Sequence, residues 1–303
     1  MTNTTSRRLF LSAAAATAGT LLVHPQALAA DDSSRQAKFI VISDTHLGHK
    51  DQPTAEAQWK QTAAELAKSE GKFVLHLGDV VDGGRESQYP LYRAARETIG
   101  KEVHEIPGNH DPQPLFEKHL VRGVDRVVED DWLRVLLMNN SRTDSHDGFL
   151  SGRQLDWLGE QLSAAASDRK LVLLAMHVPA HTNRHPDRGW HIQPQEGQTR
   201  LYELVDKHRQ QIIALLHGHF HNGIRGWSDR GQAGKAPVHE IVFPSALYNE
   251  NRKLTEQKAP GYNLSEFRPG YTLIEIRDRT MTLRYKPLGG EVTAEKALEL
   301  AAT

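Results

Sequence analysis

The chain contains no cysteine among its 303 residues. This absence excludes disulfide bonds, thiolate metal ligands and a cysteine nucleophile. The chain also lacks an excess of charge of either sign, because 37 Lys and Arg stand against 38 Asp and Glu, so composition does not indicate a nucleic-acid partner. Histidine, in contrast, occurs 17 times. Any metal site must therefore be built from imidazole, carboxylate and amide groups.

The first 30 residues have the pattern of an export signal. Arg7 and Arg8 precede an Ala/Leu/Thr run from Ser12 to Val23, and Ala27-Leu28-Ala29 supplies small residues for cleavage. A retained membrane anchor is the alternative, but the run is shorter than the roughly 20 residues that a spanning helix needs. We therefore expect a twin-arginine signal peptide, periplasmic or secreted localisation, transient contact with the twin-arginine translocation machinery and no stable membrane anchor.

Apolar runs alternate with amphipathic segments after a polar linker over residues 31–37. The predicted strands are residues 39–42, 73–77, 103–106, 133–138, 171–176, 212–216, 239–243, 271–276 and 281–285. The predicted helices are residues 55–69, 88–99, 112–119, 152–166, with Ser151 as N-cap, and 198–209. Strands separated by helices indicate βαβ units in the first two thirds, whereas successive strands in the last third indicate antiparallel pairing and a second sheet packed on the first.

These patterns predict an α/β (α+β) fold in which a two-sheet β-sandwich is flanked by helices. We expect one catalytic domain over residues 38–290 and a peripheral C-terminal helix within residues 291–303.

Four predicted strands end where residue types that bind metals begin. The segments that follow these strands are Asp44-Thr45-His46, Gly78-Asp79-Val80-Val81-Asp82, Gly108-Asn109-His110-Asp111 and His217-Gly218-His219-Phe220-His221. A fifth predicted strand, which ends at Met176, runs into His177. Because the functional crevice of an α/β sheet lies at the carboxyl ends of its strands, we expect these side chains to share one pocket.

The spacing within these segments suits metal binding. Residues two apart in an extended chain point to the same side, so Asp44 with His46, and His219 with His221, form ligand pairs. A glycine before Asp79, Asn109 and His219 lets the backbone turn sharply near a buried ion. The predicted ligands are Asp44, His46, Asp79, Asn109, His177, His219 and His221. Seven N and O ligands exceed the needs of one tetrahedral ion, so we expect two ions about 3.5–4 Å apart.

Other polar residues near the strand ends have open or structural roles. Three histidines within or beside strands are expected to be structural: His76, His104 and His217. Three more lie in a Pro- and His-rich loop, as loop or pocket-rim residues: His181, His185 and His191. Asp82 is either a hydrogen-bond partner of a ligand histidine or a solvated turn residue.

Together, these five blocks resemble the calcineurin-like metallophosphoesterases, in order and in spacing, over roughly residues 39–285. The resemblance implies that one metal is held by Asp44, His46, Asp79 and His221, and the other by Asp79, Asn109, His177 and His219. It also implies the four-layer metallophosphoesterase fold. His110 would stabilise the transition state or protonate the leaving oxygen, with Asp111 orienting it.

Within that family, the Asp-Thr-His and Gly-Asp-Val-Val-Asp blocks look most like the class III cyclic-nucleotide and glycerophosphodiester phosphodiesterases. Purple acid phosphatases carry Gly where His46 stands and an iron-binding Tyr where Asp82 stands, so an Fe(III)-tyrosinate centre is not expected. Imidazole and carboxylate ligands suit two divalent transition-metal ions such as Mn, Fe or Zn, without selecting among them.

The expected function is hydrolysis of small phosphate esters, favouring phosphodiesters, by direct attack of a metal-bound hydroxide. A nuclease of the same fold is one alternative, and a metal-stabilised binding protein without catalysis is another. The sequence does not identify the substrate, because specificity lies in loops around residues 182–198 and 246–269. It is also silent on metal identity and oligomeric state.

Direct attack by water predicts the stereochemistry at phosphorus. Because no Ser, Thr or Cys nucleophile is required, a phosphodiester made chiral with oxygen isotopes should be hydrolysed with inversion of configuration. Phosphorus NMR of the product checks this, and retention would indicate a covalent intermediate instead.

Overall fold

The computed structural model describes residues 35–180, 189–221, 238–246, 268–277 and 280–299. Its helices are α1 (Gln52–Lys68), α2 (Gln88–Arg96), the 3₁₀ helix η2 (Glu97–Ile99), α3 (Gln113–His119), α4 (Gly152–Ser167) and α5 (Gln195–Lys207). Its strands are β1 (Gln36–Ile42), β2 (Phe73–His76), β3 (Glu102–Glu105), β4 (Arg126–Glu129), β5 (Leu133–Leu137), β6 (Leu171–Ala175), β7 (Ile212–His217), β8 (His239–Val242), β9 (Gly270–Arg277), β10 (Thr280–Pro287) and β11 (Ala294–Glu299). The expected signal segment lies outside the described residues, and β1 begins within the predicted linker.

The strands form two sheets. One has the order β11-β10-β9-β1-β2-β3, and the other has the order β4-β5-β6-β7-β8. β1, β2 and β3 are parallel, as are β5 to β8, so the expected βαβ units are present. The expectation that the last third would form the second sheet was wrong. β9 pairs antiparallel with β1, with Phe39 opposite Ile274, so β9 to β11 extend the first sheet.

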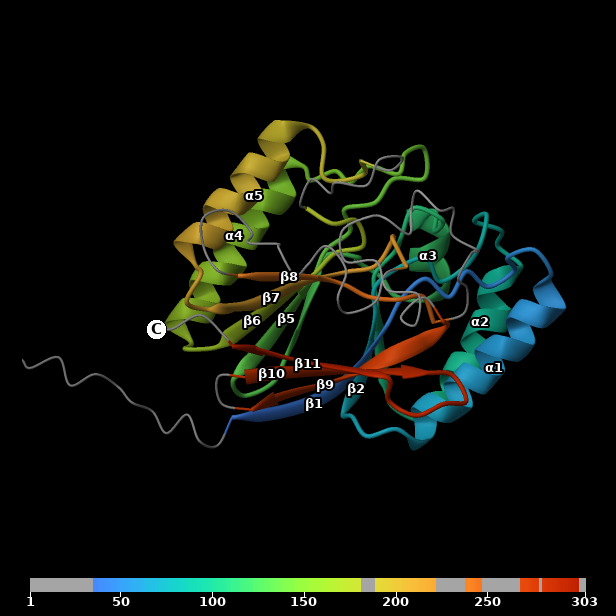
Figure 1. The fold of residues 1–303 in the computed structure, drawn as a ribbon. Coiled ribbons are helices and arrows are strands. Elements are labelled where there is room, and N and C mark those ends of the chain that lie inside the picture. The colour runs from blue at the N-terminus through green and yellow to red at the C-terminus, as the bar shows by residue number, and fades with distance from the viewer. Residues whose placement is uncertain (1–34, 181–188, 222–237, 247–267, 278–279, 300–303) are drawn as a thin grey trace, which may run out of the picture. The chain divides into compact units, whose positions relative to one another are not determined.

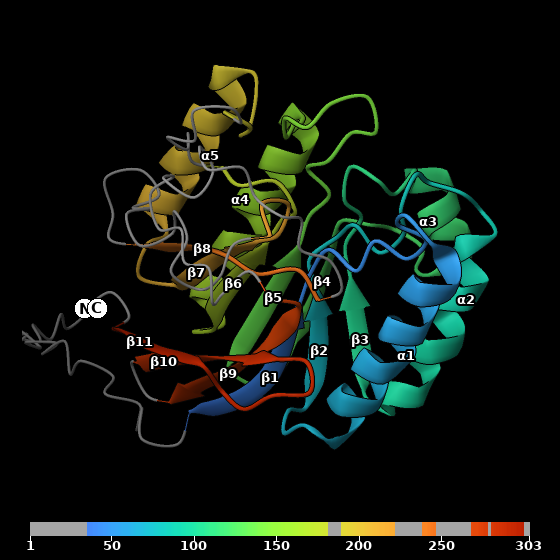
Figure 2. The same ribbon diagram turned by 45° about the vertical axis from the view of Figure 1, so that its right-hand side comes forward.

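Three apolar clusters hold the sheets and helices together as four layers. One lies between the two sheets, a second between the first sheet and α1 and α2, and a third between the second sheet and α4 and α5. Both sheets lie between these two groups of helices (Figure 1). Figure 2 shows α1 running beside β2 and β3. The sandwich flanked by helices that the sequence predicted is therefore confirmed.

β1 is covered on both faces of the sheet, and its sequence is therefore continuously apolar from Phe39 to Ile42. Phe39 and Val41 enter the cluster between the sheets, whereas Ile40 and Ile42 enter the cluster under α1. All four side chains are at most 1% exposed. Because successive side chains of a strand point to opposite faces, a strand covered on both faces reads as a continuous apolar run.

Residues 294–299 form the strand β11, so the peripheral helix expected within residues 291–303 was wrong. β11 pairs antiparallel with β10 and forms the edge of the first sheet, and Ala294 and Leu298 are buried against the core between the sheets. These two residues are four apart, a spacing that places them on one face of a helix and equally on one face of a strand. The Ala, Glu and Lys residues around them favour a helix, but the edge of β10 offers backbone partners that override this preference.

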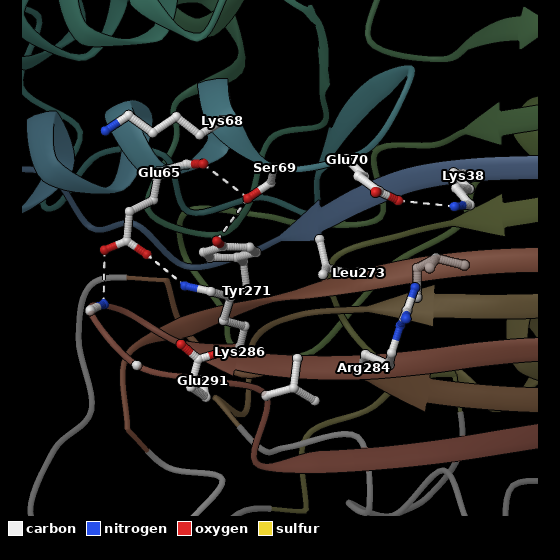
Figure 3. A pocket seen from close by; sticks show the side chains of 14 residues that line it. Lys38, Glu65, Lys68, Ser69, Glu70, Tyr271, Leu273, Arg284, Lys286 and Glu291 are labelled. Atoms are coloured by element: carbon white, nitrogen blue, oxygen red, sulfur yellow. Dashed lines mark hydrogen bonds and ion pairs between the residues drawn. The ribbon is translucent and has the colours of Figure 1, made fainter.

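A pocket of about 560 Å³ lies where the C-terminal end of α1 meets β9 and β10 (Figure 3). Glu65 on α1 accepts hydrogen bonds from the Lys286 ammonium at 3.1 Å and from the Gly289 backbone N–H at 2.8 Å. The hydroxyls of Ser69 and Tyr271 are 2.8 Å apart. The polar groups of the pocket thus brace α1 against the antiparallel part of the sheet.

Among the described residues, no helix has both the length and the apolar character required to cross a membrane.

The capping box at the start of α4 gives a test of local stability. The Ser151 hydroxyl accepts the Gln154 N–H at 3.2 Å, and the Gln154 side chain accepts the Ser151 N–H at 3.0 Å. Ser151→Ala should lower the free energy of unfolding by about 1 kcal/mol, because it leaves the Gln154 N–H without its acceptor. Ser163→Ala, at an exposed position on the same helix, should change it by less than about 0.5 kcal/mol. Urea unfolding of both variants measures these free energies, and an equal loss in the two variants would contradict the capping role of Ser151.

Candidate metal centre

The loops that follow five strands meet at the carboxyl edges of the two sheets. β1, β2 and β3 deliver the segments that begin at Asp44, Asp79 and Asn109, while β6 and β7 deliver His177 and the segment with His219. All seven predicted ligands are buried, with exposed fractions of 9% or less: Asp44, His46, Asp79, Asn109, His177, His219 and His221. The convergence that the sequence predicted is present in the structure.

Five of the seven predicted ligands have a left-handed backbone. Their φ angles lie between 41° and 72°, at Asp44, His46, Asp79, His219 and His221. Residues other than glycine adopt this conformation at a cost of about 1–3 kcal/mol each, and such residues gather at functional sites. The ligand pairs therefore converge through tight turns, and not through the extended geometry that their spacing suggested.

Three glycines allow the loops to approach one another. A Cβ at Gly78 would lie 2.5 Å from His177 Nδ1, one at Gly108 would lie 2.1 Å from Asp79 Oδ1, and one at Gly218 would lie 2.0 Å from Ser43 Oγ. Each of these distances is shorter than any ordinary contact, so only glycine fits. These glycines therefore allow close approach between the loops, whereas their expected approach to a buried ion stays a prediction.

Asp44, His46 and His221 form one group of possible ligands, whose donor atoms lie within 4.8 Å of one another. His221 Nε2 lies 3.2 Å from Asp44 Oδ1 and 3.2 Å from His46 Nε2. Burial raises the pKa of Asp44, but His221 outweighs this effect and holds that pKa below its usual range. The Asp44 carboxylate is thus charged in the group.

Asp79, His177 and His219 form a second group, again with donor atoms within 4.8 Å of one another. His177 Nε2 lies 3.2 Å from Asp79 Oδ2 and 3.3 Å from His219 Nδ1. Asn109 Oδ1 and His219 Nε2 are buried and have no hydrogen-bond partner among the described residues. Buried polar atoms normally have partners, so these two atoms point to a ligand that the centre holds in the active protein.

Asp79 connects the two groups. Its Oδ1 accepts the backbone N–H of His110 at 2.8 Å, while its Oδ2 lies 3.5 Å from His46 Nε2 and 3.2 Å from His177 Nε2. One carboxylate oxygen therefore faces an imidazole of each group, which is the placement required of a bridging ligand.

The arrangement fits transition-metal ions. Imidazole nitrogens and carboxylate oxygens, which suit transition metals, lie close together in a buried site, and Asn109 Oδ1 and His219 Nε2 have no hydrogen-bond partner among the described residues. Burial and the nearby His177 lower the pKa of His219 well below its usual value, so its imidazole is neutral, as a metal ligand must be. Burial also lowers the pKa of His177, but the Asp79 carboxylate outweighs this and raises it to about 9. Metal binding at His177 therefore requires the loss of a proton.

Two ligand imidazoles are held in place through their second nitrogen. His46 Nδ1 lies 3.2 Å from Asp82 Oδ1, and His177 Nδ1 lies 2.6 Å from the Leu77 carbonyl oxygen. With Nδ1–H donated to these acceptors, Nε2 of each ring is left to face the centre. Such partners fix the tautomer and the orientation of a metal-binding histidine.

His110 lies at the edge of the centre, with its side chain 33% exposed and its ring 4.6 Å from that of His46. Its Nδ1 is 3.3 Å from Asp82 Oδ1. Burial lowers the pKa of His110, but the hydrogen bond to Asp82 and the charges of Asp79, Asp82 and Asp111 raise it to about 9. His110 is consequently protonated at neutral pH and able to donate a proton to a bound ester.

The expectation that Asp111 orients His110 was wrong. The Asp111 carboxylate accepts the backbone N–H groups of Val80 at 3.0 Å, Val81 at 3.2 Å and Gly108 at 2.9 Å. Asp111 therefore joins the loops after β2 and β3, while Asp82 orients His110. The open question about Asp82 is resolved by its contacts with His46 and His110.

Other histidines have structural contacts. His76 Nε2 lies 3.1 Å from the Thr45 hydroxyl, and burial lowers the pKa of His76 to about 3. His217 Nε2 lies 3.2 Å from Glu240 Oε1. His191 Nε2 lies 2.7 Å from the Gln193 side-chain nitrogen within its own loop. His181 and His185 lie outside the described residues, as do most of the expected specificity loops.

Two aromatic residues at the centre were missed. The His146 and Trp190 rings stack at 4.2 Å between centroids, and Trp190 lies 5.1 Å from the ring of His219. Both residues belong to loops without periodicity, so no pattern in the sequence could have indicated them.

With this geometry in place, comparison with known proteins identifies the family. The profile of the calcineurin-like phosphoesterases matches residues 37–223. The chain belongs to this family, and it is a metallophosphoesterase with groups able to hold metal ions. The predicted family membership is confirmed.

Among curated proteins, the chain is similar to phosphodiesterases. It is 26% identical over 289 residues to a probable cyclic nucleotide phosphodiesterase of Rhodococcus erythropolis, covering 88% of each chain. It is 30% identical over 269 residues to a cAMP/cGMP dual specificity phosphodiesterase of Mycobacterium tuberculosis, covering 83% of this chain and 80% of the relative. It is also 29% identical to a probable glycerophosphodiester phosphodiesterase of Arcobacter nitrofigilis, over 51% of this chain and 58% of the relative.

Among solved structures, a dimetal phosphatase from Danio rerio has the same fold. The TM-score is 0.63 at 13% identity, over 88% of this chain and 99% of that chain.

Asp82 offers a test of how His110 is held. Asp82→Asn keeps the size of the side chain but removes the negative charge that raises the pKa of His110. If protonated His110 acts as an acid, activity falls as pH rises through its pKa, and this descending limb of kcat/KM should move to lower pH in the variant. The pH profile should not shift in Asp156→Asn, whose carboxylate pairs with Arg200 on the surface. If the descending limb of kcat/KM lies at the same pH in Asp82→Asn as in wild type, Asp82 does not set the pKa of a catalytic His110.

Proposed function

We propose that this protein is an exported phosphodiesterase that hydrolyses small phosphodiesters with two divalent transition-metal ions. The observation that carries the proposal is the placement of Asp79 Oδ2 between His46 Nε2 and His177 Nε2, which joins two groups of buried ligands. Relatives named as cyclic nucleotide and glycerophosphodiester phosphodiesterases support a diester substrate. The pattern of the first 30 residues supports export.

Asp44, His46, Asp79 and His221 would hold one ion, and Asp79, Asn109, His177 and His219 would hold the other. When bound, these ions would supply Lewis acidity at the phosphoryl oxygens and lower the pKa of water. The protein contributes a buried setting in which Asp44 and Asp79 are charged and His219 is neutral, which favours cations over other ligands.

His110 is the group of this chain that would move a proton. Hydrolysis adds the oxygen of water to phosphorus and breaks the ester P–O bond, so the departing oxygen gains a proton. His110 is partly exposed, carries a proton at neutral pH and is oriented by Asp82. After donating that proton, the neutral imidazole would recover it from solvent.

Metal removal tests the proposal directly. Treatment with a strong chelator should abolish hydrolysis of bis(4-nitrophenyl) phosphate, and Mn²⁺ or Zn²⁺ should restore it. We expect kcat/KM for this diester to exceed that for the monoester 4-nitrophenyl phosphate. Activity that is indifferent to chelation would contradict the metal mechanism, and a preference for the monoester would contradict the diester assignment.

His110→Ala separates catalysis from binding. Loss of the proton donor should lower kcat by about 10²- to 10⁴-fold while the metal content, measured by plasma mass spectrometry, stays at the wild-type level. If wild type and variant bind metal and are equally inert on every phosphoester tried, the protein is a metal-stabilised binding protein.

A further inference from the structure

A stack of rings borders the metal centre on the side of His219. Phe220 lies in the small apolar cluster with Val242, and Trp190 packs on that cluster at 5.7 Å from the Phe220 ring. His146 stacks on Trp190 at 4.2 Å with an angle of 20° between the rings. His146 is exposed, whereas Trp190 is half-buried. The stack therefore begins in the core and ends at the exposed side chain of His146.

This stack lies beside the second ligand group. The ring of His219 is 5.1 Å from Trp190 and 5.8 Å from His146. His110, in contrast, lies beside His46 of the first group. A phosphoester whose phosphate lies at the metal centre would thus have the proton donor at one ligand group and the ring stack at the other.

Hydrogen bonds hold the two loops that carry the stack. The Gly148 N–H donates to the His191 carbonyl at 3.0 Å, and the Gln193 N–H donates to the Gly148 carbonyl at 2.7 Å. The Asn140 side chain binds both backbone groups of Val178, the residue next to His177, at 2.7 and 3.0 Å. The backbones of the loops next to His146 and Trp190 are therefore anchored beside the metal centre, and such anchoring lowers the entropy cost of binding.

We propose that His146 and Trp190 form a stacking platform for a flat aromatic part of the substrate, such as a nucleobase. Aromatic side chains that end in an exposed, rigid face bind bases by offset stacking, and such contacts tolerate different bases because every base has a π-face. This inference rests on the proposed function, since it names the substrate class of the same site: phosphodiesters that carry a planar ring, in preference to aliphatic glycerol diesters.

The test compares two diesters in the metal-loaded protein: 3′,5′-cyclic AMP and glycerophosphoethanolamine. His146→Ala should raise KM for the cyclic nucleotide about tenfold, which corresponds to about 1.4 kcal/mol of lost stacking, with kcat changed less than about twofold. Both kcat and KM for the glycerol diester should stay within about twofold of the wild-type values. His146→Phe should restore the wild-type KM, because a phenyl ring stacks in the same way.

Phe149→Ala is the matched control, because Phe149 is an exposed aromatic residue on the same loop, 38% exposed and outside the ring stack. Phe149→Ala should leave kcat and KM unchanged for both substrates. Trp190→Leu should reproduce the loss seen in His146→Ala, because it removes the support of the imidazole. Equal losses on both diesters, or no loss on either, would overturn the platform.

Calorimetry provides a readout that does not depend on turnover. Adenosine 5′-monophosphate should bind about tenfold more weakly to His146→Ala than to wild type, whereas glycerol 3-phosphate should bind both equally. If wild type hydrolyses neither diester, the proposed function fails, and the difference between these two ligands still decides whether the platform exists. If His146→Ala weakens the binding of both ligands by the same factor, the stacking platform is contradicted.

Discussion

The carboxylate of Asp79 is the constraint on which the centre depends. One oxygen accepts the His110 backbone N–H, and the other lies between His46 and His177. Loops after β1, β2, β3 and β6 are thereby joined at a single buried group. A buried charge is costly unless it is paired, so the surrounding imidazoles stabilise the charged Asp79 in the folded protein. Burial raises the pKa of Asp79, but these histidines lower it well below its usual value.

The four-layer architecture makes this concentration of polar groups possible. Three apolar clusters fix the strands, so the strain of the left-handed turns at the strand ends is balanced by packing elsewhere. Asp111 adds a second clamp, because its carboxylate accepts three backbone N–H groups from the loops after β2 and β3. Burial and the charge of Asp79 raise the pKa of Asp111 to about 7, although these N–H groups oppose the rise. The centre is thus preorganised by backbone contacts as well as by its side chains.

The sequence predicted most of the fold and the convergence of the seven ligand residues, because apolar runs and the polar blocks that end them are local patterns. It did not predict the division into sheets, because the pairing of β9 with β1 joins residues more than 200 positions apart. The strand β11 was missed because Ala294 and Leu298 suit a helix and a strand equally. The roles of Asp82 and Asp111 depend on which backbone N–H each carboxylate reaches, and His146 and Trp190 meet only in the folded chain. Such contacts between loops leave no periodic signal.

Anomalous diffraction from crystals loaded with Mn²⁺ or Zn²⁺ would test the central claim most directly. The account predicts two peaks about 3.5–4 Å apart, one beside Asp44, His46 and His221 and the other beside His177 and His219, with Asp79 touching both. A single peak, or peaks away from Asp79, would contradict it.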